Sequence, residues 1–444
     1  MTTIKDIVRN DLCVGCGLCV SESQTSTMEW NEYGFLTPKL DDSFNDTAIK
    51  VCPFNPNPDN AVRDEDKLAD IYFKGSTHKD EHIGRFENTY VGYADEYRET
   101  SSSGGIATYV FEQLLKQDIV QNIFVVKELN GTYAYQWFKD AEQIKEISKT
   151  RYIPVTLEKL FKEIDTIEGK IAVSGVACFI KAIRLKQHYH PQLKGKIPFL
   201  VGIICGGLKS SFFSDYLAQK SGIEGEYNKQ QYRIKDFNST ASDYSFGAFD
   251  KSKKFHQMKM RTVGDMWGTG LFKNNACDFC DDVTTELADI SLGDAWLQPY
   301  NKDGAGTSVI VTRSKIADKL IKEGIDNKSL SVEELNLDRF KASQEGSFKH
   351  RQKATAYRIK KKRKTQQVIP QKRERLFQSI PLEFKLVQNL RMQLRAKSLT
   401  SWKENPNALV FENDIAPLKK ELRIKTIIYH YAQVIKGKLG MRKL

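Results

Sequence analysis

Apolar and polar positions in the middle of the chain alternate in a way that predicts an α/β fold. The run "NTYVGYADE" (88–96) is predicted as a strand, and "IATYVFEQLLKQ" (106–117) spaces its apolar residues as an amphipathic helix does. Further apolar runs, "NIFVVKE" (122–128), "KIAVSG" (170–175) and "FLVGIIC" (199–205), predict three more strands. Strands that alternate with helices predict a largely parallel or mixed sheet.

The second half of the chain continues this pattern and then changes character. The run "GTSVIVTRS" (306–314) predicts a strand, and "KIADKLIKEG" (315–324) predicts the helix after it. Near the C-terminus, apolar and basic positions alternate with helical spacing, as in "FKLVQNLRMQLRAK" (384–397) and "RIKTIIYHYAQVIKGKLG" (423–440). The most apolar stretch, "IPFLVGIIC" (197–205), is too short to span a bilayer and is predicted as a buried strand.

The length of the chain and these changes of pattern predict three parts. At 444 residues the chain exceeds what one compact core usually holds. We expect a small cysteine-bearing module at residues 1–60, an α/β domain at 85–345 and a basic helical region at 346–444. The polar start "MTTIKDIVRND" lacks the apolar core of a secretory signal, which predicts a cytoplasmic protein with reduced thiols.

Positive charge is concentrated just before the C-terminal helical stretches. Residues 349–375 hold twelve Lys or Arg against one acid, Glu374, so they carry nearly all of the net charge of +12. A solvated basic helix or tail is the simplest interpretation. Attraction to an anionic membrane surface, on the inner membrane face, is the second, because apolar and basic positions alternate in the helices that follow. No aromatic stacking platform accompanies the charge, so we expect no nucleic-acid partner.

Four cysteines near the start of the chain have the spacing of an iron–sulfur site. "LCVGCGLCV" places Cys13, Cys16 and Cys19 three residues apart, with glycines between them that allow tight turns. A fourth thiol, Cys52, is followed by proline, as at the end of a bacterial ferredoxin run. These four ligands predict half a ferredoxin with one 4Fe–4S cluster. A zinc site is the alternative, which the triple spacing disfavours because zinc ribbons use two separated Cys-x-x-Cys pairs.

The other four cysteines follow predicted strands or form a pair. Cys178 comes after "KIAVSG", Cys205 ends "FLVGIIC", and Cys277 and Cys280 form a Cys-x-x-Cys pair. Loops at the carboxyl ends of parallel strands line the ligand crevice of α/β proteins, so these thiols can meet there and hold a second cluster. The alternative is that Cys178 and Cys205 are buried small apolar residues.

A turn rich in serine and glycine precedes the helix predicted at 106–117. Its residues are Ser101, Ser102, Ser103, Gly104 and Gly105. Glycines let backbone amides approach a ligand, and a helix N-terminus favours an anion, so the turn is a candidate phosphate site. A helix capped by the serines is the alternative.

Together these motifs resemble the family of coenzyme F420 hydrogenase/dehydrogenase beta subunits, with an N-terminal 4Fe–4S ferredoxin module attached. The shared order is the half-ferredoxin, Ser-Ser-Gly-Gly before a helix, Arg-Tyr in "TRYIPV", Gly-x-x-Cys, Ile-Cys-x-Gly, Cys-x-x-Cys, "ADISLGDAW" and "GTSVIV". The resemblance implies an iron–sulfur flavoprotein oxidoreductase with two 4Fe–4S clusters and a flavin, FAD rather than FMN. Its implied partners are a ferredoxin-like electron donor or acceptor and an organic substrate or coenzyme F420.

The resemblance also implies roles for individual residues. It assigns the second cluster to Cys178, Cys205, Cys277 and Cys280, and the flavin phosphates to the serine–glycine turn. Arg151 and Tyr152 correspond to the basic–aromatic pair near the flavin, and Asp294 in "LGDAW" to a residue that orients a polar group of the flavin or substrate. A cap or turn aspartate is the alternative for Asp294. No catalytic residue follows from these motifs.

Two departures from the family pattern affect the expected chemistry. Residues 175–179 read "GVACF" where the family commonly has Gly-Thr-Pro-Cys-Gln, and residues 205–207 read "CGG" where it commonly has Cys-His-Gly. The cysteines remain but polar groups are replaced, so the clusters are better supported than F420 chemistry. Many bacterial members resemble stand-alone reductases of surface polysaccharide biosynthesis. A non-catalytic electron-transfer or scaffold subunit is the competing function.

Overall fold

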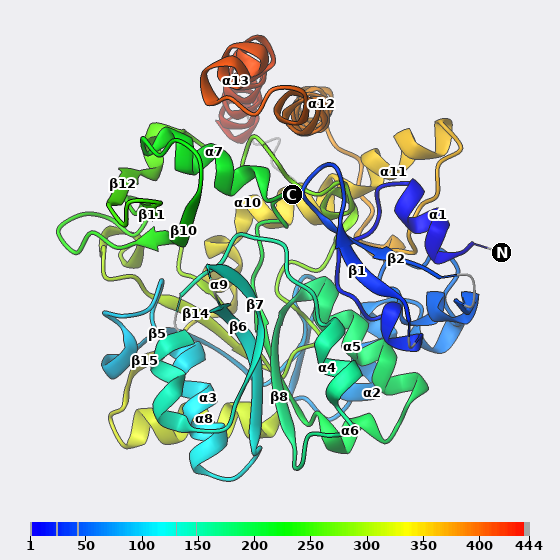
Figure 1. The fold of residues 1–444 in the computed structure, drawn as a ribbon, viewed down its shortest axis with the longest axis vertical. Helices are drawn as coiled ribbons and strands as arrows, with labels where there is room; N and C mark the ends of the chain where they lie inside the picture. The colour runs from blue at the N-terminus through cyan, green and yellow to red at the C-terminus, as the bar shows by residue number, and fades with distance from the viewer. Residues whose placement is uncertain (1, 24, 42–43, 130, 148, 439–444) are drawn as a thin grey trace.

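A mixed eight-stranded sheet forms the centre of the molecule (Figure 1). In sheet order its strands are β15 (Leu330–Glu334), β5 (Asn88–Ala94), β14 (Ser308–Thr312), β13 (Ile290–Asp294), β9 (Phe199–Ile203), β8 (Ile171–Val176), β6 (Asn122–Leu129) and β7 (Thr132–Phe138). The four strands β13, β9, β8 and β6 run parallel, and the outer pairs are antiparallel. The mixed sheet confirms the predicted α/β class.

This computed structural model describes residues 2–438 except 24, 42–43, 130 and 148.

Alternating side chains of the central strands bury both faces of the sheet. On β8, Ile171 and Val173 enter one hydrophobic cluster and Ala172 enters another. Helices α3 (Ile106–Lys116) and α8 (Lys315–Asp326) cover the second face, and α5 (Ala177–Tyr189) covers the first (Figure 1). A strand that is buried on both faces has a continuous run of apolar residues in its sequence. For this reason the central strands could be predicted from the sequence.

The cysteine-bearing N-terminal segment packs on the α5 side of the sheet. It contains α1 (Ile4–Arg9), the hairpin of β1 (Thr27–Trp30) and β2 (Leu36–Lys39), and the turns η1 (Val20–Glu22) and η2 (Asp46–Val51). Ile7, Leu12 and Val51 share one hydrophobic cluster with Ile180 and Ile183 of α5. The segment therefore has its apolar side chains in the core of the α/β sheet, and the domain boundaries at 60, 85 and 345 stay predictions.

The remaining helices and strands connect or extend these layers. They are α2 (Glu65–Tyr72), β3 (His78–Asp80), β4 (Gly84–Phe86), α4 (Glu158–Glu163), α6 (Leu193–Lys196), α9 (Leu337–Ser343) and α10 (Glu345–Phe348). A π-helical turn, η9 (Lys349–Lys353), leads into α11 (Thr355–Lys364).

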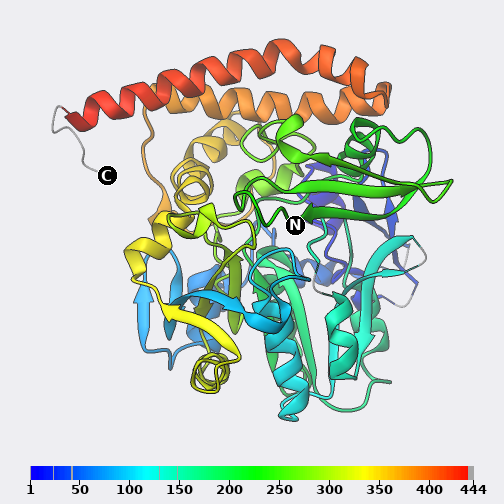
Figure 2. The same cartoon turned by 90° about the vertical axis from the view of Figure 1, so that its left-hand side faces the viewer.

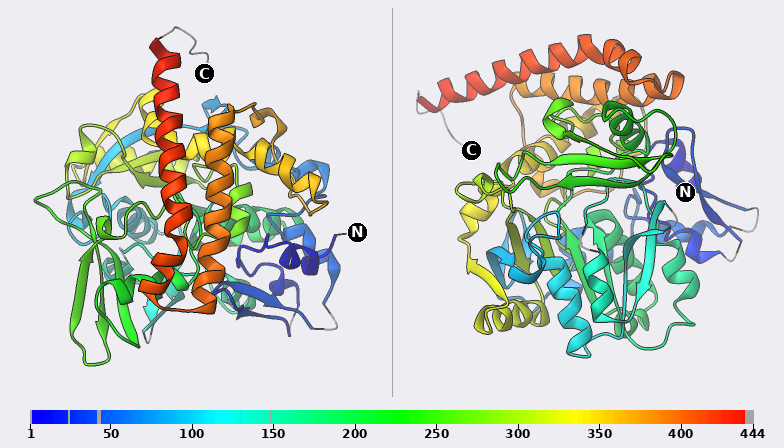
Figure 3. Two further views of the ribbon diagram at one scale, coloured as in Figure 1. Left: turned by 90° about the horizontal axis from the view of Figure 1, so that it is seen from above. Right: turned by 60° about the vertical axis from the view of Figure 1, so that its left-hand side comes forward.

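A second layer lies beyond the main sheet. It consists of the three-stranded sheet β10 (Tyr227–Ile234), β11 (Ser245–Asp250) and β12 (Phe255–Lys259), helix α7 (Phe212–Lys220), and the pair α12 (Leu382–Glu404) and α13 (Ala408–Lys438). The two C-terminal helices lie side by side along one edge of the molecule (Figures 2 and 3). Trp402 and Phe411 pack with Phe272 in the cluster that also holds α7.

The structure corrects part of the interpretation of residues 349–375 as a solvated basic helix or tail: Lys360, Lys361, Arg363 and Lys364 of α11 are exposed, whereas other cations of the segment are buried. Arg351, Arg358, Lys372 and Arg373 are buried. Arg373 donates to both carboxylate oxygens of Glu286, at 2.7 and 2.9 Å. The segment is therefore part of the fold, because its cations neutralise acids buried beneath it.

The C-terminal helices are confirmed as helices within the described residues. Their last predicted positions, 439–444, lie outside the part of the chain that the structure describes. Among the helices of residues 2–438, none combines the length and apolar character needed to cross a membrane.

Candidate redox site

The first four cysteines converge in the N-terminal segment. Cys13 and Cys16 lie in the loop after α1, Cys19 precedes η1, and Cys52 follows η2. Gly17 has φ of +81°, and a Cβ there would lie 2.1 Å from the Thr156 hydroxyl, so the loop requires glycine. The hollow at these thiols is lined by Cys13, Cys16, Cys19, Cys52, Ile4, Ile7, Val8, Leu12, Val14, Gly17, Met28, Pro38 and Pro53. We call these four cysteines the first cysteine group.

The thiols of this group line one hollow and, beyond the effect of burial, lie close enough to raise one another's pKa. Burial raises the pKa of Cys13 to about 11 and that of Cys16 to about 12. Burial also raises the pKa of Cys19, and the thiols of Cys16, Cys13 and Cys52 raise it further. Because metals bind thiolates, binding at this group would release protons.

The other four cysteines also converge, as a second cysteine group. Cys178 lies in the first turn of α5, Cys205 follows β9, Cys277 lies in the turn η7 (Asn275–Phe279), and Cys280 ends that turn. Burial raises the pKa of Cys178, and the thiols of Cys280, Cys277 and Cys205 raise it further. The backbone amide of Gly207 donates to Cys205 Sγ at 3.2 Å. The carboxyl ends of β8 and β9 thus bring Cys178 and Cys205 to the Cys-x-x-Cys turn.

The spacing of these thiols bears on what each group can hold. Within the described residues, no three His, Cys, Asp or Glu side chains are gathered so as to bind a single metal ion. The thiolates around a 4Fe–4S cluster bind different iron atoms, so four thiols that line one hollow, as those of the first cysteine group do, fit a 4Fe–4S cluster.

Cations from the C-terminal segment lie directly on the second cysteine group. Arg351 donates to Cys280 Sγ at 2.5 Å and to the Cys205 carbonyl oxygen at 2.6 Å. Burial raises the pKa of Cys277 to about 12, and Lys273, a cation from outside the C-terminal segment, acts in the opposite direction. Sequence reasoning missed these contacts, because the basic run does not indicate which of its cations are buried.

The two cysteine groups are neighbours. The side-chain amide of Asn274, three residues before Cys277, donates to the Cys13 carbonyl oxygen at 2.9 Å. The Cys16 thiol is close enough to Cys178 to raise its pKa, after the larger effects of burial and the other thiols. Loops far apart in the sequence therefore hold the groups side by side.

The serine–glycine turn is largely bonded within the protein. Ser101 donates its hydroxyl to the Tyr97 carbonyl oxygen at 2.5 Å, and the Ser102 hydroxyl accepts from the Thr150 amide at 2.9 Å. The Ser103 hydroxyl donates to the Thr307 carbonyl oxygen at 3.4 Å. A serine side chain does not occupy the N-cap of α3, because that residue is Gly105.

The two glycines of this turn have different surroundings. Gly105 adopts φ of +81°, which favours glycine. A Cβ at Gly104 would lie 2.7 Å from the Gly92 carbonyl oxygen and 2.8 Å from the Ser308 hydroxyl. Gly104 therefore permits a close approach to β5 and β14, and a larger residue there would disturb the fold itself.

The predicted flavin residues Arg151, Tyr152 and Asp294 lie in one aromatic and cationic region. The guanidinium of Arg151 stacks on Tyr133 at 4.6 Å. Burial raises the pKa of Tyr152, and Arg233, Asp294 and Cys205 all lie close enough to act on it. Tyr152 thus lies within electrostatic range of both the second cysteine group and the Arg233–Asp294 pair.

Two further cations belong to this region and were missed from the sequence. Arg233 donates to Asp294 at 2.5 Å, which shows that Asp294 is an ion-pair partner at the end of β13. Lys235 donates to the Ser103 carbonyl oxygen at 2.7 Å. Burial, with Arg98 and Arg233 nearby, lowers the pKa of Lys235 to about 7. Arg233 and Lys235 come from β10 and the turn after it, which carry no motif.

Two guanidinium nitrogens of this region are free to donate hydrogen bonds to a bound polar ligand. Among the described residues, the Nε atoms of Arg151 and Arg233 are buried without a hydrogen-bond partner. Unpaired buried donors are costly, so a group with acceptor atoms would complete them. A flavin, with its phosphates and ring carbonyls, fits this donor set.

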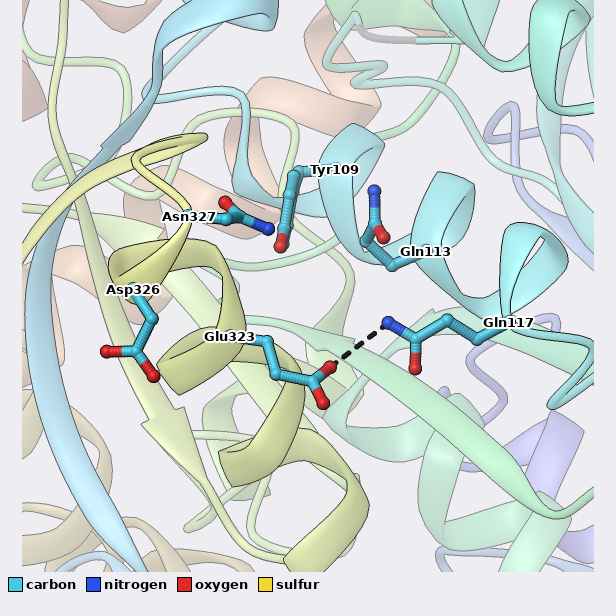
Figure 4. Close-up of a pocket in the computed structure, with 6 residues that line it drawn as sticks. All are labelled: Tyr109, Gln113, Gln117, Glu323, Asp326 and Asn327. Atoms are coloured by element: carbon cyan, nitrogen blue, oxygen red, sulfur yellow. Dashed lines mark hydrogen bonds between the residues drawn. The ribbon is translucent and has the colours of Figure 1, made fainter.

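An open pocket elsewhere does not share these features. It lies between α3 and α8 and is lined by Tyr109, Gln113, Gln117, Glu323, Asp326 and Asn327 (Figure 4). Gln117 donates to Glu323 at 3.1 Å across it. No cysteine lines this pocket, so the candidate redox site is the region around the two cysteine groups.

Comparison with known proteins identifies the family. Residues 89–162 match the N-terminal part, and residues 168–338 the C-terminal part, of the family described as "Coenzyme F420 hydrogenase/dehydrogenase, beta subunit". The chain belongs to this family. The matched residues include the second cysteine group, whereas the first group and Arg351 lie outside them.

Two curated relatives are distant in sequence. The chain is 22% identical over 363 residues to a coenzyme F420-dependent sulfite reductase of Methanocaldococcus jannaschii, covering 76% of this chain and 51% of that protein. It is 23% identical over 305 residues to one of the subunits of the F(420)H(2) dehydrogenase of Methanosarcina mazei. This alignment covers 65% of this chain and 77% of that protein. The chain thus spans about half the length of the first relative. Both names support a redox role.

A solved structure shares the fold. A chain of the F420-reducing [NiFe] hydrogenase complex from Methanosarcina barkeri aligns with a TM-score of 0.51 and 17% identity. The alignment covers 66% of this chain and 99% of the other. At this identity the match establishes the fold alone.

Proposed function

We propose that this protein is an iron–sulfur flavoprotein oxidoreductase. In this proposal the two cysteine groups hold 4Fe–4S clusters, and a flavin, FAD rather than FMN, occupies the region of Arg151, Tyr152 and Asp294. Electrons pass between the clusters and the flavin, which reduces or oxidises an organic substrate or coenzyme F420. Membership of the family of F420 hydrogenase/dehydrogenase beta subunits supports the redox class.

The arrangement in space is the single observation that carries the proposal. Asn274, three residues before Cys277 of the second group, donates to the Cys13 carbonyl oxygen of the first group at 2.9 Å. Burial raises the pKa of Tyr152, and Cys205 of the second group lies near enough to raise it further. The three proposed cofactor sites thus follow one another through the protein, which suits electron transfer between them.

The residues of this chain would hold and tune these cofactors. Bound clusters and flavin supply the one- and two-electron chemistry. Arg151 and Arg233 would donate to acceptor atoms of the flavin, and Lys235 would bring a cation to the serine–glycine turn. Arg351 and the Gly207 amide would stabilise negative charge on the second cluster.

The competing function is non-catalytic electron transfer within a larger complex. It is favoured by the names of two similar proteins, one a component of a dehydrogenase and one a chain of a hydrogenase complex. Residues 175–179 and 205–207 lack polar side chains that the family commonly has there, which also favours the non-catalytic role. The partner in either case would be a ferredoxin-like electron carrier. A role in polysaccharide synthesis stays an expectation of the sequence resemblance.

Cofactor analysis after anaerobic purification tests the proposal. We expect about eight iron atoms, about eight acid-labile sulfides and one flavin per chain. A reductant titration should show the flavin spectrum change together with both clusters. Clusters without flavin would support the non-catalytic electron-transfer role, and zinc in either group would overturn the two-cluster assignment.

A further inference from the structure

Helix α13 is apolar on two opposite faces. Its inner face, including Phe411, Ile415 and Leu422, is buried against α12 and α7. Six apolar residues on the other face are exposed, and we call them the outer stripe: Ile424, Ile427, Ile428, Tyr431, Val434 and Ile435. Their exposed fractions range from 45% for Ile427 to 68% for Tyr431. Packing within the chain explains the inner face and leaves the outer stripe in contact with solvent.

The outer stripe is continuous along the helix. Ile424, Ile427 or Ile428, Tyr431, and Val434 or Ile435 follow one another at intervals of three or four residues, which places them on one side of an α-helix. From Ile424 to Ile435 the stripe extends for about 17 Å at 1.5 Å per residue. A contiguous exposed apolar surface of this kind marks an interaction site more often than scattered exposed residues do.

Basic residues border the stripe on both sides. At 100° per residue, Arg423 falls on one border, and Lys425 and Lys436 fall on the other. Residues 419–438 contain six Lys or Arg and one acid, Glu421. Lys436 also pairs with Glu383 at the start of α12, at 3.3 Å. The charge around the stripe is therefore strongly positive.

The position of α13 leaves the stripe accessible. The helix forms the outer edge of the molecule, and its last turns extend beyond the rest of the fold (Figures 2 and 3). A flat surface can approach it without opening any layer of the protein.

We propose that the outer stripe lies in the surface of a membrane that contains anionic lipids. An apolar stripe bordered by cations on both sides matches the boundary between acyl chains and negative headgroups, where a helix lies in the plane of the membrane. A second copy of the chain would bring the same positive charge against the stripe, which opposes self-association. This surface lies within the apolar and basic stretch at 423–440 that the sequence indicated, whereas the basic run at 349–375 is partly buried, with Arg351 on the second cysteine group.

Vesicle flotation of the purified holoprotein tests the proposal. At low salt, we expect the protein to float with phosphatidylcholine vesicles containing phosphatidylglycerol, and to stay behind when phosphatidylcholine is the only lipid. Added salt should release it, because screening weakens the attraction of surface charges.

Matched variants locate the contact. Ile428→Asp combined with Ile435→Asp should weaken vesicle binding at least about tenfold, since two apolar anchors become charged. Arg423→Glu should weaken it by about thirtyfold, because this change removes a positive charge and adds a negative one, and each unit of charge near the surface contributes about 1 kcal/mol. Ile316→Asp is the control, because Ile316 is 42% exposed on α8, on the opposite side of the molecule (Figure 1).

Several outcomes would overturn the proposal. One is absence of binding to anionic vesicles at low salt, and another is binding that the double variant leaves unchanged. A third is a dimer in sedimentation that the double variant dissociates, since the stripe would then be an interface between copies of the chain. Iron and flavin contents should be equal in all variants, which separates this test from that of the redox function.

Discussion

The two cysteine groups differ most in the charge around them. The first group is close together in sequence and is lined by apolar residues such as Ile4, Leu12 and Met28. The second is assembled from three distant loops, and Arg351 donates directly to one of its sulfurs. A positive charge beside a cluster favours the reduced form. We therefore expect the second cluster to have the higher reduction potential and to receive electrons from the first.

Removing the C-terminal segment should have the largest effect, because it removes the cations around the second cysteine group and also destabilises the fold. A chain that ends at Ser347 loses Arg373, which leaves Asp281 and Glu286 buried without that partner. Breaking a buried ion pair costs about 3–5 kcal/mol. We expect this chain to aggregate or to melt far below the full chain, as measured by circular dichroism.

The matched control for this truncation is a chain that ends at Lys438, which keeps all of these contacts. If the basic region were only an anchor, as one interpretation of the sequence has it, a chain ending near Ser347 would keep its clusters. Recovery of a folded protein with about eight iron atoms from that chain would contradict the structural role of residues 349–375.

Single cysteine variants should separate the two groups. Cys16→Ala and Cys277→Ala should each reduce the iron content from about eight to about four atoms. Only Cys277→Ala should also change the flavin spectrum, because the second group includes Cys205, which lies within electrostatic range of Tyr152 at the proposed flavin site. Iron analysis and visible absorption measure both effects. If both variants changed the flavin spectrum equally, the proposal that the second cysteine group lies nearer to the flavin than the first would be wrong.

Neutralising Arg351 should change the second cluster alone. Arg351→Gln removes a charge from Cys280 Sγ, so the potential of the second cluster should become more negative while that of the first stays unchanged. Arg351→Lys should restore part of the shift. Redox titration followed by electron paramagnetic resonance measures both potentials, and Arg375→Gln, at an exposed pair with Asp66, is the control. An equal shift of both clusters would contradict a local effect.

The smallest expected effect concerns flavin affinity and pH. The folded apoprotein holds the pKa of Lys235 at about 7, below its usual 10.5, so the lysine is charged below pH 7 and neutral above it. An anionic flavin phosphate at the serine–glycine turn favours the charged form. Affinity should therefore fall by up to about tenfold per pH unit above 7, and the fall should disappear in Lys235→Gln. Fluorescence titration measures it, and a pH-independent affinity in the wild type would place the phosphate elsewhere.

Local patterns predicted much of the fold and part of the site. The strand expected at 122–128 is β6, the helix expected at 106–117 is α3, and the helix expected at 315–324 is α8. Weakly apolar elements such as β10 and β15 were not predicted, because half-exposed strands lack a continuous apolar run. Arg233 and Lys235 were missed for the same reason.

The sequence by itself determined the first cysteine group, since three of its cysteines and the glycines between them lie within one loop, where their short spacing keeps the thiols close together. It also determined the central strands, because side-chain period and burial are local properties. Only the tertiary structure decided that Cys178, Cys205 and Cys280 meet, that Arg351 donates to the Cys280 sulfur, and that four cations of the segment 349–375 (Arg351, Arg358, Lys372 and Arg373) are buried. Those contacts depend on how distant segments pack, and a run of basic residues has the same sequence whether its charges face water or buried acids.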